Sequence, residues 1–179
     1  MIVGGDVGGT KTLLGLFDVG PAETGHYRTA AHRPRVIATY SYATSDYGSI
    51  GEILDEFRRA VGPLSVEAAA IGVAGPVVGN AAKLTNISWG INAREIAAGL
   101  GTTRVQILND LEALANGVTV LTADEVCVLQ AGVPRADGNA AVIAAGTGLG
   151  QALLYRVGGR LRPVASEGGH ADFAARGSQ

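Results

Sequence analysis

Two glycine-rich turns, each next to short apolar runs, restrict the fold more than any other feature of this 179-residue sequence. The first, Gly-Asp-Val-Gly-Gly-Thr-Lys at 5–11, lies between apolar runs at 2–5 and 12–17, and the second is Gly-Thr-Gly-Leu-Gly at 146–150. Apolar runs on both sides of a glycine turn are typical of strands joined in a hairpin. The sequence therefore predicts two antiparallel segments, one at the start of the chain and one near its end.

The stretch between the two turns alternates strand and helix signals. Strands are predicted at 35–43, 68–74, 104–108, 126–129 and 140–145, and helices at 49–61, 93–100 and about 111–118. A hairpin over 150–165, turning at Val157-Gly158-Gly159, follows the second glycine turn. This order predicts an α/β fold of two related halves, with a small lobe at 1–110 and the beginning of a larger lobe at 111–179.

Composition and charge exclude several classes of protein. Hydrophobic residues make up 47% and charged residues 17% of the chain, as in globular proteins. The net charge of −2 gives no basic field for a nucleic-acid backbone, so nucleic acid is not an expected partner. No apolar run reaches the ~18 residues that cross a bilayer, and the N-terminus has no export signal. We therefore expect a cytoplasmic protein that does not enter membranes.

The single cysteine, Cys127, can form neither an internal disulfide nor a zinc cluster. It lies in the apolar run that contains the predicted strand at 126–129. Free cysteines are among the residues most often buried in proteins. We therefore expect Cys127 to be a buried core thiol.

The glycine turns do not match the two commonest phosphate-binding loops. In the first turn Thr10 and Lys11 stand in the reverse of the P-loop order, and a strand follows instead of a helix. The second turn lacks the helix of the dinucleotide fingerprint. Glycine turns can still offer backbone N–H groups to a phosphate, with Thr10 adding a hydroxyl and Asp6 holding Mg²⁺ nearby. The alternative is a plain hairpin in which Asp6 bonds its own turn.

Polar residues follow the predicted strand at 104–108. Asn109 and Asp110 stand where α/β sheets present their ligands, although Asp110 could equally cap the next helix. Later in the chain, Glu167 and His170 flank two glycines, and a purely structural histidine is the alternative there. His170 and Asp172 alone are too few ligands to predict a metal site.

Five motifs in order carry a resemblance to a known family. They are GDVGGTKT, GVAGPVVGNAAKLTNISW, ILNDLEALANG, AAGTGLGQALL and SEGGHADF. With these motifs the chain resembles the bacterial glucokinases of the hexokinase, actin and heat-shock ATPase superfamily over its whole length. The resemblance implies a ribonuclease H-like, actin-like ATPase fold.

The resemblance also implies roles for individual residues in ATP- and Mg²⁺-dependent phosphorylation of glucose, or a related hexose, at its 6-hydroxyl. Asp110 would be the catalytic base, and the sugar would be bound by Asn109, Asp110, Glu167 and His170. The phosphates would be bound by Asp6, Gly8, Gly9, Thr10 and Lys11 of the first turn and by Gly146, Thr147 and Gly148 of the second, with Asp6 near the metal. Trp89 and the segment 84–86 match a stretch near the sugar cleft, although Trp89 could be only a core or hinge anchor.

Two further expectations concern the length and the class of the chain. A complete family member would continue past Gln179, so we expect this chain to be a poor catalyst alone, to expose apolar surface and to form homo-oligomers. The alternatives are a non-catalytic sugar sensor on the same fold, or another kinase or a polyphosphate-hydrolysing enzyme of the superfamily. A sensor with a DNA-binding helix-turn-helix would carry it ahead of the first strand, whereas here that strand starts at Ile2.

Overall fold

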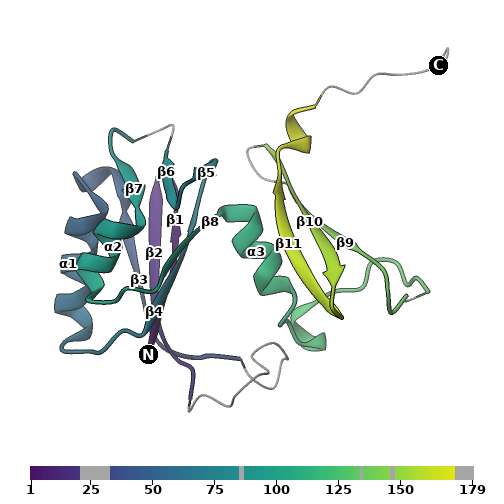
Figure 1. Ribbon diagram of the computed structural model, residues 1–179, viewed down its shortest axis with the longest axis horizontal. Helices are drawn as coiled ribbons and strands as arrows, with labels where there is room; N and C mark the ends of the chain where they lie inside the picture. The colour runs from purple at the N-terminus through teal and green to yellow at the C-terminus, as the bar shows by residue number, and fades with distance from the viewer. Residues whose placement is uncertain (21–32, 85–86, 134, 146–147, 172–179) are drawn as a thin grey trace.

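The computed structural model describes residues 1–20, 33–84, 87–133, 135–145 and 148–171, and a five-stranded mixed sheet forms the centre of its N-terminal part (Figure 1). The strands are β1 (Ile2–Val7), β2 (Lys11–Asp18), β3 (Arg35–Ala43), β4 (Ala68–Val73) and β8 (Val105–Asn109), in the order β3-β2-β1-β4-β8. The first three pair antiparallel, and β4 pairs parallel with both β1 and β8. The predicted N-terminal hairpin is therefore confirmed.

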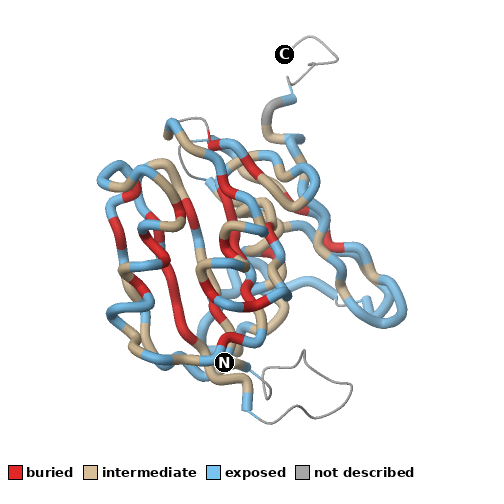
Figure 2. The backbone as a smooth tube through the Cα atoms, turned by 60° about the vertical axis from the view of Figure 1, so that its left-hand side comes forward, coloured by how far each residue is buried: buried red, intermediate tan, exposed pale blue. Residues whose placement is uncertain are grey.

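Two amphipathic helices cover one face of this sheet, and α3 lies on the other side (Figure 1). Helix α1 (Ile50–Val61) begins after Ser49 and α2 (Ala93–Leu100) after Asn92, and each of these residues accepts a backbone N–H of the first turn through its side chain. Four apolar residues of α1 are fully buried, and one of them, Phe57, packs edge-on against Tyr40. Figure 2 shows in red how buried residues are distributed along the chain. Both helices agree with the periodicity of the sequence.

Three short strands between β4 and α2 were not predicted. They are β5 (Val77–Val78), β6 (Ala81–Lys83) and β7 (Gly90–Asn92), which form a small antiparallel sheet. The turn that joins β5 to β6 has positive φ angles at both Gly79 (61°) and Asn80 (59°). The Asn80 amide also bonds the backbone of β8, donating to Val105 O at 2.9 Å and accepting from Ile107 N at 2.7 Å. A Gly-Asn pair is a hairpin signal that could have revealed this turn.

The later part of the chain forms a helix and a second antiparallel sheet. Helix α3 (Asp110–Val118) precedes β9 (Ala140–Ala145), β10 (Leu149–Val157) and β11 (Arg160–Ser166), in the order β11-β10-β9. The predicted hairpin at its end is confirmed, with positive φ at Gly158 (58°) and Gly159 (76°). One face of the sheet packs on α3 through Ala152 and Leu154, which form a hydrophobic cluster separate from that of the first sheet.

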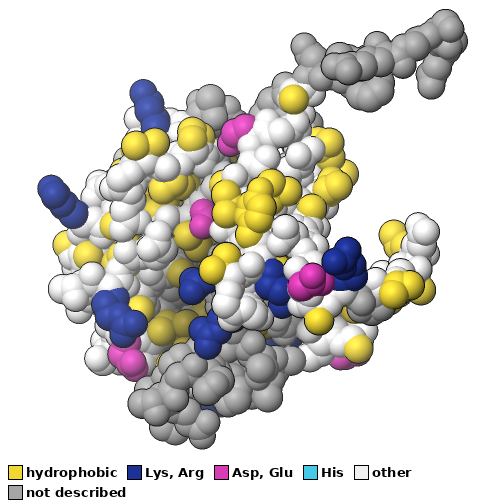
Figure 3. Space-filling model, turned by 45° about the vertical axis from the view of Figure 1, so that its right-hand side comes forward, with side chains coloured by type: hydrophobic (Ala, Val, Ile, Leu, Met, Phe, Trp, Pro, Cys, Tyr) yellow, Lys and Arg dark blue, Asp and Glu magenta, His cyan; other side chains and the backbone are white. Residues whose placement is uncertain are grey.

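The opposite face of the second sheet is exposed. Strand alternation and register place on this face Ile143, Leu149, Leu153, Tyr155, Val157 and Val164, each with between 39% and 68% of its surface accessible. The space-filling view shows hydrophobic side chains gathered in patches with few charges among them (Figure 3). The expectation of exposed apolar surface is therefore confirmed for this chain.

The predictions for residues 126–129 are wrong. This segment is not a strand, because it follows the short 3-10 helix η3 (Ala123–Glu125) without pairing with any described strand. Its apolar side chains lie in solvent, with Leu129 94% exposed, and Cys127 is exposed as well. An apolar run predicts burial only where another element covers it, and here none of the described elements does so.

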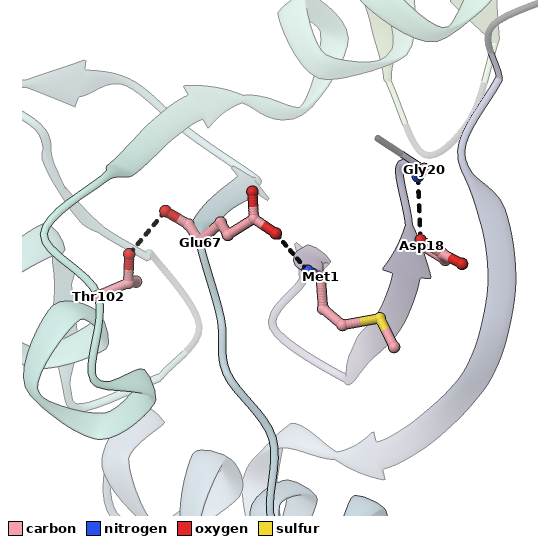
Figure 4. A network of polar contacts seen from close by, with 5 residues as sticks. All are labelled: Met1, Asp18, Gly20, Glu67 and Thr102. Carbon is pink, nitrogen blue, oxygen red and sulfur yellow. Dashed lines mark hydrogen bonds and ion pairs between the residues drawn. The ribbon is translucent and has the colours of Figure 1, made fainter. Parts of the chain in front are cut away.

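A small polar network fixes the amino ends of β1 and β4 (Figure 4). The amino group of Met1 donates to Glu67 Oε1 at 2.8 Å, and Thr102 Oγ1 donates to the Glu67 carbonyl oxygen at 2.9 Å. The hydrogen bond from the Met1 amine, followed by the positive charge of that amine, lowers the pKa of Glu67. These contacts lie at the amino ends of the strands, whereas Asp110 follows the carboxyl end of β8. Across the described part of the chain, no helix combines the length and apolar character of a membrane span.

An ion pair links the segment before β3 to η3, far along the chain. Arg33 Nη1 lies 2.6 Å from Glu125 Oε2, which also accepts from the backbone N (3.0 Å) and Oγ1 (3.1 Å) of Thr122. The bond from Arg33, followed by those from Thr122, lowers the pKa of Glu125 to about 2.

We expect Glu125→Gln to lower the thermal stability of the chain slightly at pH 7. A carboxyl group with a lowered pKa contributes stability above its ordinary pKa of about 4.3, and that contribution is lost as the pH falls toward 2. Melting curves should therefore separate the variant from the parent at pH 7 and converge in acid. Arg33→Gln is the matched control, and combining the two changes should add little. A difference that persists at pH 2 contradicts this account.

Candidate active site

A cavity of about 640 Å³ lies at the carboxyl ends of β4 and β8, where the start of α3 meets the second sheet. It brings together four of the residues that the sequence indicated for the site: Asn109, Asp110, Gly148 and Glu167. The remaining lining comes from Ala74, Gly75, Leu111, Ala144, Ala145, Leu149, Gly150, Gln151 and Ser166. Segments far apart in the sequence therefore share one cleft, at the position where α/β sheets bind ligands.

Asn109, and not Asp110, caps α3. Its side-chain oxygen accepts from the N–H groups of Leu111 (3.0 Å) and Glu112 (3.3 Å), and its Nδ2 donates to Gly75 O at 3.1 Å. Both the oxygen and the nitrogen of the Asn109 amide are therefore bonded, and this fixes the orientation of the side chain. The sequence left open whether Asp110 capped the helix, and the structure gives that role to its neighbour.

Asp110 is the first residue of α3 and is half-buried at the cleft. Its Oδ1 accepts from the N–H of Leu111 at 2.9 Å. Oδ2 makes no hydrogen bond to any residue that the structure describes, so it can accept a bond or a proton from a ligand. The helix N-terminus stabilises the charged carboxylate.

Asp6, at the carboxyl end of β1, lies close enough to Asp110 for the two carboxylates to repel each other. Asp6 keeps contact with solvent, but neighbouring atoms displace part of the water around its carboxylate. This desolvation raises the pKa of Asp6, the Asp110 charge raises it further, and Lys11 opposes both effects. Two acids of like charge beside a glycine turn are a donor set that fits a divalent cation with oxygen ligands.

The first glycine turn is held by backbone bonds and by a buried hydroxyl pair. Gly8 N–H donates to Lys11 O at 3.0 Å, and Thr44 N–H donates to Thr10 O at 3.0 Å. Thr12 Oγ1 and Thr44 Oγ1 lie 2.8 Å apart and fully buried beneath the turn. The N–H groups of Gly9 and Thr10 bond no other described residue, so they remain available to an anion.

We expect Asp6→Asn to raise the melting temperature of the ligand-free chain at pH 7. A carboxyl group whose pKa is raised by folding costs stability once the pH exceeds its ordinary value of about 3.9, because the folded chain then holds an unfavourable charge. The advantage of the neutral amide should shrink as the pH falls below that value. Thermal melts at pH 7 and pH 3, without Mg²⁺, measure the difference. Equal or lower stability of the variant at pH 7 contradicts the repulsion.

Three of the predicted site residues lie partly or wholly outside the part of the chain that the structure describes. Gly146 and Thr147 of the second turn are outside the described residues, and for His170 only the backbone, within the 3-10 helix η4 (Gly168–His170), is described. Trp89 packs on the hydrophobic core of the first sheet, and its Nε1 donates to Tyr47 O at 2.9 Å. In the segment 84–86, Leu84 is buried in that core, and the other two residues are outside the description.

Several residues that line the cleft were not identified from the sequence. Gly75 was given no role, yet its carbonyl oxygen accepts from Asn109 Nδ2 and its φ is 133°. Gln151 and Ser166 face each other in the register of β10 and β11, and both line the cleft. Gln151 and Ser166 can be identified only from the pairing of β10 and β11, which the local sequence does not reveal.

Comparison with solved structures gives the class of this fold. A glucokinase from an Antarctic psychrotroph superposes with a TM-score of 0.81 at 27% identity, over 98% of this chain and 52% of that one. A ROK family glucokinase from Streptomyces griseus, solved with glucose and AMPPNP, superposes with a TM-score of 0.55 at 27% identity, over 90% of this chain and 46% of that one. The expected fold is confirmed, and it is the actin-like ATPase fold of the sugar kinases.

Sequence comparison then gives the family. The glucokinase family model matches residues 3–179. The glucokinase of Nostoc punctiforme is 34% identical over 176 residues, which cover 98% of this chain and 49% of the relative. The chain belongs to the glucokinase family, and it spans about half the length of the curated relatives it matches.

Proposed function

We propose that this chain provides the sugar-binding cleft and the first phosphate-binding turn of an enzyme that transfers the γ-phosphoryl group of ATP to the 6-hydroxyl of glucose. The observation that carries the proposal is the shared cleft of Asp110 and Glu167 beside Asn109. The ROK family glucokinase from Streptomyces griseus, which was solved with glucose and AMPPNP, supports the choice of sugar and nucleotide. We place this reaction in the cytoplasm and in glycolysis as part of the same proposal.

Asp110 acts as the base in this proposal. A sugar hydroxyl is too weak an acid for a carboxylate to ionise in advance, but its proton becomes acidic as the oxygen–phosphorus bond forms. The Oδ2 atom of Asp110 then accepts that proton while Oδ1 stays bonded to Leu111 N–H. Asn109, Glu167 and His170 bind the other hydroxyls and orient the sugar.

Asp6 and the glycine turns hold the phosphate end. The N–H groups of Gly9 and Thr10, the Thr10 hydroxyl and the Lys11 ammonium group bind phosphate oxygens, together with Gly146, Thr147 and Gly148 of the second turn. Asp6 is the residue we assign to Mg²⁺, directly or through water, because a cation held there would relieve its repulsion by Asp110. When bound, Mg²⁺ supplies charge neutralisation at the phosphoryl oxygens.

We further propose that residues 1–110 and 111–179 belong to two lobes that close over the sugar. The two separate hydrophobic clusters support this division. Closure excludes water, which competes with the sugar as a phosphoryl acceptor. The exposed face of the second sheet supports self-association of this chain.

Calorimetric titration with glucose and, separately, with ATP and Mg²⁺ tests the proposal. We expect glucose to bind and to bind more weakly when Glu167 is replaced by Ala. A single-turnover measurement with excess chain and labelled ATP tests the transfer itself and detects even slow catalysis. Glucose binding without any transfer, both by this chain and by this chain joined to the C-terminal half of a relative, supports a sugar sensor instead. The absence of binding to both ligands overturns the assignment of the cleft.

A further inference from the structure

The turn that follows β11 lies directly on the start of β10. Gly168 N–H donates to Ser166 Oγ at 3.1 Å, and Ala171 N–H donates to Gly168 O at 3.1 Å. A Cβ atom added to Gly169 would lie 1.7 Å from Leu149 O, a backbone atom that cannot move aside. The turn therefore approaches β10 so closely that only glycine fits at this position.

Gln151 lies beneath the same turn. It is half-buried, pairs with Ser166 across β10 and β11, and lines the cleft together with Glu167. A Cβ atom added to Gly168 would lie 2.6 Å from Gln151 Oε1 and 3.6 Å from its Cδ. The end of the Gln151 side chain thus occupies the space that a side chain at Gly168 would need.

The two adjacent glycines make this turn costly to order. Glycine loses more backbone freedom on ordering than any other residue, so contacts with β10 add to the two hydrogen bonds of the turn in keeping one shape. Glu167 immediately precedes this turn and lies on the wall of the cleft. The contact with Gln151 is therefore placed to control where Glu167 stands.

We propose that Gln151 is a positioning residue for the sugar site, acting through Gly168 to hold Glu167 in the cleft. This proposal rests on the proposed function, because it assigns Glu167 to the sugar. The role depends on the length and packing of the side chain. Methionine, which has a similar length, should replace glutamine, whereas alanine should not.

Glucose affinity, measured by calorimetry on the 179-residue chain, tests this role. We expect Gln151→Ala to weaken glucose binding about tenfold, Gln151→Met to stay within about twofold of the parent, and the affinity for ATP with Mg²⁺ to stay unchanged in both. Gln106→Ala, a matched change on β8 at the wall of a different cavity, should leave glucose binding unchanged. A general loss of folding would move both affinities together.

A double-variant comparison tests the contact itself. Gly168→Ala should weaken glucose binding because its new methyl group, 2.6 Å from Gln151 Oε1 and 3.1 Å from Ser166 Oγ, displaces the Gln151 side chain. Adding Gln151→Ala should then cause little further loss, because that side chain is already displaced, so that the two effects are not additive. Additive effects overturn the proposal, as does a Gln151→Met variant as weak as Gln151→Ala. If Gln151→Ala fails to fold, the methionine and Gly168 variants decide.

Glu167→Ala separates this inference from the proposed function. If Glu167→Ala weakens glucose binding and Gln151→Ala does not, the positioning role fails and the sugar cleft stands. If the Glu167 change also has no effect on glucose binding, the assignment of the cleft to a sugar fails first.

Discussion

Replacing Asp110 with Asn is expected to lower phosphoryl transfer to glucose by about 10²- to 10⁴-fold, the usual contribution of a general base. Glucose affinity should change much less, because an amide still accepts and donates hydrogen bonds to sugar hydroxyls. The loss should therefore fall on the rate at saturating glucose and not on glucose binding. Single-turnover rates and calorimetric affinities, measured on the same preparation, give the two quantities.

The structure favours asparagine over alanine at this position. The amide oxygen can keep the bond from Leu111 N–H that Asp110 Oδ1 now accepts. Asn109 continues to cap α3, so the start of the helix stays in place. The favourable interaction of a negative charge with the helix N-terminus, about 0.3–1 kcal/mol of stability, is lost, and the repulsion between Asp110 and Asp6 is relieved.

Asp55→Asn is the matched control, since Asp55 is an exposed residue of α1 and does not line the cleft. It removes the same charge without touching the site, and its turnover should equal that of the parent. The comparison can be repeated after this chain is joined to the C-terminal half of a relative, which should raise the rates of all variants. Retention of normal transfer by Asp110→Asn would falsify the role of this residue as the base.

The regular elements could be predicted because their signals are local. Helices α1 and α2 follow from apolar residues three and four apart, and the first glycine turn lies between the two strands that flank it in the sequence. The small β5-β6-β7 sheet was missed because strands of two or three residues are too short to show alternation. The prediction for Cys127 was wrong because burial depends on a covering element, which the local sequence does not reveal.

The interactions between the site residues were harder to predict than the residues themselves. The sequence indicated Asp6 and Asp110 separately, through a turn and through a strand end. Their mutual repulsion arises from the sheet order, in which β4 lies between β1 and β8 and aligns their carboxyl ends. The division of roles between Asn109 and Asp110 likewise depends on side-chain geometry at the helix start.

Gly72 is the point at which the first sheet sets the position of Asp110. In the register of β4 it pairs with Asp6 on one side and with Leu108 on the other. A Cβ atom at Gly72 would lie 3.0 Å from Ala113 Cβ and 3.8 Å from Asp110 Cα. Helix α3 therefore rests on a strand residue without a side chain, immediately beside Asp110.

We expect Gly72→Val to lower phosphoryl transfer by about 10²-fold, because displacing a reacting group by about 1 Å is enough for such a loss. The valine methyl groups cannot be accommodated by rotating a neighbouring side chain, since Ala113 offers only a Cβ on a helix. The whole of α3 must therefore move, and we expect a loss of about 1–3 kcal/mol of stability from the overpacking. Turnover and thermal melts measure the two effects.

A second-site change distinguishes displacement of α3 from general damage to the fold. Gly72→Ala should lower turnover less than the valine variant, and adding Ala113→Gly should restore turnover by removing the methyl group that it meets. The same double variant should be less stable, because glycine inside a helix costs about 1 kcal/mol. Gly117→Ala, in α3 where the added Cβ meets nothing within 4 Å, should preserve turnover. Recovery of turnover without recovery of stability follows only if Gly72 acts by setting the position of Asp110.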